Sequence, residues 1–121
     1  MRAELRYIEP NNDNLSWDDF VATGVPEPWD FSGQFTLSIG SVGSRGADLF
    51  VVVIATHAGA CRLKGHGTPF KGLIVESFEP EIIAKFLHEY VSSIESPTWQ
   101  GIVEQLKPNM DWEFSYMEPI Q

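Results

Sequence analysis

A change of hydrophobic period along the chain does most to limit its fold. Residues 34–39 alternate strictly between polar and apolar side chains, the pattern of a strand with one buried face. Residues 49–54 are apolar at every position, as in a central strand covered on both faces. The connection at 41–46 is rich in glycine, which supplies the conformations a tight loop needs. The two strands are therefore predicted to form a hairpin.

The last third of the chain changes to the period of a helix. Seven apolar residues fall on one helical stripe: Ile82, Ile83, Phe86, Leu87, Tyr90, Val91 and Ile94. Pro80 occupies a first-turn position of this helix, which is predicted over 80–93. A second helix is predicted over 97–106, with Ser96 as its N-cap and Pro108 behind its end. Both stripes are expected to pack on the sheet.

Shorter patterns complete the predicted order of elements. Alternating or apolar residues at 3–7, 73–75 and 112–116 predict an opening strand, a third central strand and a closing strand. Residues 10–32 are expected to be irregular or briefly helical, and 57–72 to be a loop. The order predicts the α+β class: a mostly antiparallel sheet of about five strands, two C-terminal helices on one face and a closing strand. Residues 1–121 are expected to form a single domain.

The charge of the chain excludes one class of partner. Asp and Glu number 17 against 8 Lys and Arg, a net charge of −9. Nucleic-acid binding needs a basic surface to contact phosphates, so no nucleic acid is expected as partner. The acids are concentrated in 1–31, at net −5, and in 76–121, at net −7, whereas 32–75 carries +3. The two acidic ends form one face only if the fold brings them together.

The compartment is predicted from what the sequence lacks. Cys61 is the only cysteine, so an internal disulfide is impossible, which fits a reducing compartment. The first residues are not followed by the apolar segment of a signal peptide. The longest apolar run, 49–55, is far shorter than the ~20 residues of a spanning helix. We therefore expect a cytoplasmic protein with no membrane partner.

Four residues have the chemistry of a nucleophilic or metal site: Asp48, His57, Cys61 and His66. A structural zinc site usually has four ligands in paired arms, and the sequence offers no second arm. A cysteine nucleophile needs a nearby base and an oxyanion hole, which this spacing does not define. We therefore expect no catalytic residues, metal or cofactor, with Cys61 as a small buried side chain. A small enzyme using His57, Cys61 and His66 is the alternative.

The N-terminal irregular segment is the first candidate for contact with a partner. It places two tryptophans beside carboxylates, a combination found in interface hot spots: Trp17, Asp18, Asp19, Glu27, Trp29 and Asp30. Alternatively, the acids serve solubility alone, and the tryptophans cover an edge of the core. The outer face of the 80–93 helix, with Glu81 and Glu89, is a competing surface but offers no large anchor.

Several segments together carry a family resemblance. The sequence includes Phe35-x-Leu37-x-Ile39-Gly40-x2-Gly43-x2-Gly46-Ala47-Asp48-x-Phe50, then Leu73-Ile74-Val75-Glu76-x-Phe78, Thr98-Trp99 and finally Trp112, Glu113, Phe114 and Tyr116. In this order, and with the opening strand 1–6, they resemble the immunity protein 8 family of bacterial polymorphic toxin systems over nearly the whole chain. After Thr56 such proteins often carry a proline and an aromatic residue, whereas this chain has His57-Ala58-Gly59. The 57–72 segment is therefore expected to differ in shape.

The resemblance implies a cytoplasmic antidote. Such a protein binds a cognate toxin domain and neutralises it, and the family brings no catalytic residues. An acidic inhibitor suits a toxin with a basic active site, such as a nuclease, because complementary charge accelerates encounter. An interaction domain unconnected with any toxin is the remaining alternative.

Overall fold

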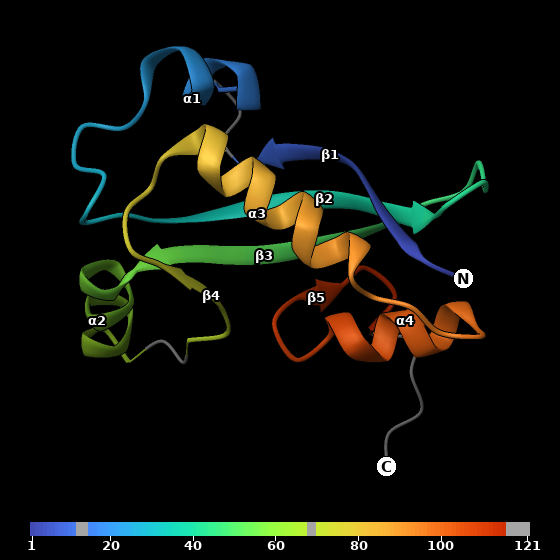
Figure 1. Ribbon diagram of the computed structural model, residues 1–121. Coiled ribbons are helices and arrows are strands. Elements are labelled where there is room, and N and C mark those ends of the chain that lie inside the picture. Colours follow the sequence, from blue (N-terminus) through green and yellow to red (C-terminus); the bar gives the residue numbers. More distant parts are fainter. Residues whose placement is uncertain (12–14, 68–69, 116–121) are drawn as a thin grey trace.

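Three long strands form most of the sheet in the computed structural model, which describes residues 1–11, 15–67 and 70–115 (Figure 1). β1 (Ala3–Pro10), β2 (Ser32–Ser41) and β3 (Asp48–Thr56) are antiparallel neighbours in chain order. The β2–β3 pair is the hairpin predicted from the alternating and apolar segments.

Two short strands share the far edge of β3. β4 (Gly72–Val75) runs parallel to its last residues, and β5 (Asp111–Trp112) pairs antiparallel with Phe50 and Val51 near its start. The sheet is thus mostly antiparallel with five strands, and the predicted α+β class is confirmed. The closing strand is shorter than expected, and Tyr116 lies outside the described residues.

One face of the sheet carries the core. Alternate residues of β2 and β3 are buried there together with side chains of α3 (Pro80–Ser92) and α4 (Trp99–Leu106). The largest of these buried side chains are Phe35, Leu37, Ile39, Phe50, Ile54, Leu87, Ile102 and Leu106. Burying each contributes about 1.5–3 kcal/mol. Both C-terminal helices therefore lie on one face, as predicted, although α4 begins at Trp99 and Thr98, not Ser96, caps it.

A helix replaces most of the loop predicted over 57–72. α2 (His57–Gly65) follows β3 directly, and its first turn is capped by the Thr56 side chain, which accepts a hydrogen bond from Gly59 N. The loop prediction was wrong because it took Gly59 as a sign of an irregular segment. Instead this glycine permits close packing, since a Cβ there would overlap the carbonyl oxygen of Phe31. The N-terminal segment contains a second short helix, α1 (Trp17–Thr23).

Two apolar surfaces are less covered than the sequence predicted. Leu49, Val51 and Val53 of β3 are only half-buried, so the prediction that both faces of this strand are covered was wrong. On α3, Ile83, Leu87 and Val91 are buried, whereas Ile82 and Phe86 are exposed. The predicted stripe is therefore wider than the surface that the sheet covers. No helix in the described part of the chain is long and apolar enough to cross a membrane.

Candidate functional site

The structure separates the two tryptophans of the N-terminal segment. Trp17 is half-buried, and its ring meets those of Phe35 and Phe78 edge-on at centroid distances of 5.7 and 6.3 Å. It therefore packs against the edge of the core. Trp29 is 67% exposed in the connection between α1 and β2. Of the two, Trp29 has the accessibility of a partner anchor.

The connection that carries Trp29 is held at both sides. Asp30 accepts two hydrogen bonds from the guanidinium of Arg62 on α2, at 2.9 and 2.6 Å. Phe78 N donates to Pro28 O at 2.6 Å, which fastens the connection to the chain just before α3. Glu27 O accepts from Asp30 N at 3.0 Å and closes a turn. The exposed indole of Trp29 thus projects from a fastened loop.

The two acids of α1 have different roles. Asp19 belongs to a capping box: its carboxylate accepts from Ser16 N at 2.8 Å, and its own N–H donates to Ser16 Oγ at 3.2 Å. Asp18 is exposed and, among the described residues, makes no ion pair or side-chain hydrogen bond. Asp19 is thus committed to starting the helix, whereas the Asp18 carboxylate is available to a partner.

The fold brings the two acidic ends of the chain together. α3 lies over β1, and α1 packs beside α3 (Figure 1). A groove of about 510 Å³ runs between them and is lined by Tyr7, Glu9, Trp17, Asp18 and His88, among others. Among the described residues, eight exposed acids make neither an ion pair nor a side-chain hydrogen bond: Glu9, Asp18, Glu27, Glu76, Glu79, Glu81, Glu89 and Glu95. The fold therefore brings acidic residues from both ends of the chain onto neighbouring elements, which the sequence left conditional.

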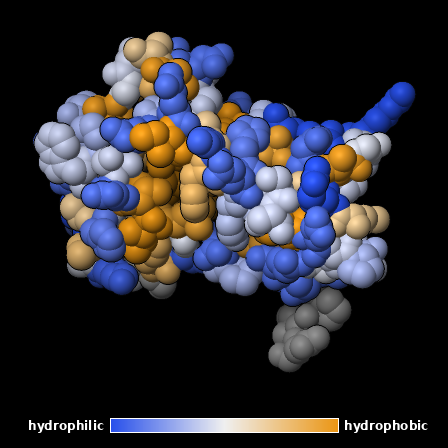
Figure 2. All heavy atoms as spheres, in the orientation of Figure 1, coloured by the Kyte–Doolittle hydropathy of each residue, from blue (hydrophilic) through white to orange (hydrophobic). Residues whose placement is uncertain are grey.

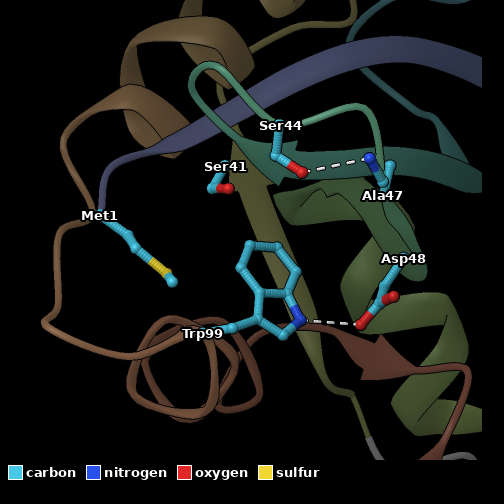
Figure 3. A pocket seen from close by; sticks show the side chains of 8 residues that line it. Met1, Ser41, Ser44, Ala47, Asp48 and Trp99 are labelled. Atoms are coloured by element: carbon cyan, nitrogen blue, oxygen red, sulfur yellow. Dashed lines mark hydrogen bonds between the residues drawn. The ribbon is translucent and has the colours of Figure 1, made fainter.

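A partly buried cluster of side chains at the start of β3 holds the C-terminal elements to this strand. Sequence reasoning missed this cluster. One carboxylate oxygen of Asp48 accepts from Trp99 Nε1 at 2.8 Å and from Trp112 Nε1 at 2.9 Å. Glu113 adds two bonds: its N–H donates to Leu49 O, and its carboxylate accepts from Leu49 N. Figure 3 shows the Asp48–Trp99 bond beside a pocket of about 290 Å³. The two tryptophans lie 51 and 64 positions after Asp48 in the chain, so no local sequence pattern pairs them with it.

The alternative catalytic residues do not assemble. Asp48 and His57 lie at opposite ends of β3, nine residues or roughly 30 Å apart. Cys61 is exposed on α2, so the expectation that it is buried was wrong; His57 and His66, expected in a loop, begin and cap that helix. Among the described residues, no three His, Cys, Asp or Glu side chains are placed to hold a metal ion.

The fold and surface together define a class: a small α+β domain with many unpaired carboxylates and several exposed aromatic or aliphatic side chains. The sequence profile described as Immunity protein 8 matches residues 4–116. The chain therefore belongs to the immunity protein 8 family and is an immunity protein. Neither curated proteins nor solved structures gave a match to it.

Proposed function

We propose that this protein binds the toxin domain of a bacterial polymorphic toxin system and neutralises it in the cytoplasm by forming a stoichiometric complex. The observation that supports this best is that the fold brings acidic residues from both chain ends onto neighbouring elements in a member of an immunity family. Eight exposed carboxylates of the described residues make neither an ion pair nor a side-chain hydrogen bond, so a basic partner can supply their counter-charges. A basic toxin such as a nuclease has the complementary charge.

The N-terminal segment is the proposed contact surface. Trp29 supplies a large exposed ring on a fastened loop, and Asp18 and Glu27 supply free carboxylates nearby in the chain. Large aromatic anchors govern dissociation, and surrounding charges mainly accelerate association. Trp17, Asp19 and Asp30 support this surface, through core packing, helix capping and the bond to Arg62.

The proposed mechanism is binding without catalysis. The family is one of immunity proteins, and the histidines and cysteine of the alternative enzyme are exposed and spread along α2 and its end. Inhibition then requires one protein molecule per toxin molecule, and activity should return when the complex dissociates.

Calorimetric titration tests the proposal directly. The probe is the toxin domain encoded beside the gene for this chain, titrated with the purified protein. The proposal predicts saturation at a molar ratio of one and loss of toxin activity at the same ratio. Absence of heat and of inhibition, or inhibition at a small fraction of the toxin concentration, would contradict it.

A further inference from the structure

The apolar side of α3 that the sheet leaves open is the strongest unexplained surface. Ile82 is 63% exposed and Phe86 43% exposed, and Phe86 stacks on the half-buried Tyr90 at a centroid distance of 6.2 Å. These three residues, called here the α3 flank, are spaced by four and so form one continuous strip along the helix, which runs from exposed Ile82 to Tyr90, packed against the core. In Figure 2 apolar residues gather beside the N-terminal half of α3, framed by hydrophilic ones.

The α3 flank has an acidic border. Glu79 lies three positions before Ile82, and Glu89 lies three positions after Phe86, so both carboxylates adjoin the strip. Neither makes an ion pair with any described residue. Over residues 76–95 five acids stand against Lys85 as the single base. An apolar centre with a charged border is the composition of a protein interface.

We infer that the α3 flank is a second docking surface for the same toxin domain, whose matching surface is an apolar patch bordered by Lys or Arg. This inference rests on the proposed function. It also supplies the large anchors that the sequence did not assign to the outer face of this helix. The loop bearing Trp29 is bonded at Pro28 to Phe78, which precedes α3 and lies four residues before Ile82, so one partner can contact both surfaces.

A second copy of this chain is a poor occupant. Two copies would bring their Glu79 and Glu89 borders together, and each molecule carries a net charge of −9. Like charges placed opposite one another oppose association. A basic partner gains from the same border.

The test compares Ile82→Ala with Ile74→Ala, its matched control. Ile74 is a 45% exposed isoleucine on β4, where its neighbours Leu73 and Val75 pack on the core, so Ile74 points to the other face of the sheet. Both variants should keep the wild-type melting temperature, since exposed side chains contribute little to stability. Calorimetry with the adjacent-gene toxin domain should show the Kd raised at least tenfold by Ile82→Ala and unchanged by Ile74→Ala.

A second variant covers the case in which Phe86 alone keeps most of the affinity after Ile82→Ala. Ile82→Asp places a charge in the centre of the α3 flank and should raise the Kd further than Ile82→Ala. If the wild type and all three variants bind the toxin domain with equal affinity, the inference is overturned and the proposed function still stands. No binding by the wild type would instead count against the proposed function itself. A dimer in light scattering that Ile82→Asp dissociates would also overturn the inference, because the occupant would then be a second copy.

Discussion

At the scale of single residues, Asp48 holds three elements together with one carboxylate oxygen. The sequence indicated only that an acid follows the glycine-rich turn, whereas the structure pairs it with Trp99 and Trp112. The family resemblance rests on these same positions. Their contacts explain the pattern by folding: Asp48 at the start of β3 fixes the approach of α4 and β5.

Replacing Asp48 by Ala should lower the free energy of unfolding by about 2 kcal/mol, because two half-buried indole N–H groups lose their acceptor. The control is Asp111→Ala, which breaks the exposed Lys71 ion pair and should cost less than about 1 kcal/mol. Urea denaturation of both variants measures the difference. Equal losses would mean that the shared carboxylate contributes no more than a surface pair.

Trp29→Ala should separate binding from folding. The ring is 67% exposed, so the free energy of unfolding should change by less than about 0.5 kcal/mol. Loss of a hot-spot aromatic should raise the Kd for the toxin domain about 30-fold. Trp17→Ala is the contrasting variant, since its ring packs on Phe35 and Phe78, and it should lower the melting temperature. A sharp fall in melting temperature for Trp29→Ala would assign Trp29 to the core instead.

At the scale of elements, α2 depends on Gly59, a residue that on sequence grounds indicated a loop instead of a helix. Gly59→Ala should destabilise the protein by about 2 kcal/mol or more, because its Cβ would overlap the Phe31 carbonyl. Gly65 lies in the same helix with open space around it, so Gly65→Ala should be neutral or stabilise by up to about 1 kcal/mol. Thermal unfolding of the two variants measures the difference. A lower melting temperature for Gly65→Ala than for Gly59→Ala would contradict this packing.

The elements also show how far sequence reasoning reaches. Periodicity located β2, β3, α3 and α4, because side-chain alternation and helical stripes follow directly from burial on one face. It failed where tertiary contact decides, as at α2, where glycine allows close approach. It also could not predict how wide a stripe the sheet would cover, so Ile82 and Phe86 were assigned to the core. Among the candidate contact residues, only the structure separates Trp29 from Trp17.

At the scale of the whole molecule, charge should control the rate of association. The net charge of −9 and the joined acidic ends predict that association with a basic toxin slows as salt is raised. Dissociation should change much less, since the apolar anchors determine it. Stopped-flow measurements between about 50 mM and 500 mM salt check both rates. An association rate independent of salt would leave the acids with a role in solubility only.

Survival during co-expression tests most directly whether this protein protects a cell from a toxin by binding it. Bacteria should die when they express the adjacent-gene toxin domain alone and survive when they express this chain with it. Cys61→Ser should protect equally, since the exposed thiol has no catalytic part in the account. Trp29→Ala combined with Ile82→Asp should fail to protect at equal protein level. Death despite the wild-type protein at that level, or full protection by the double variant, would contradict the account.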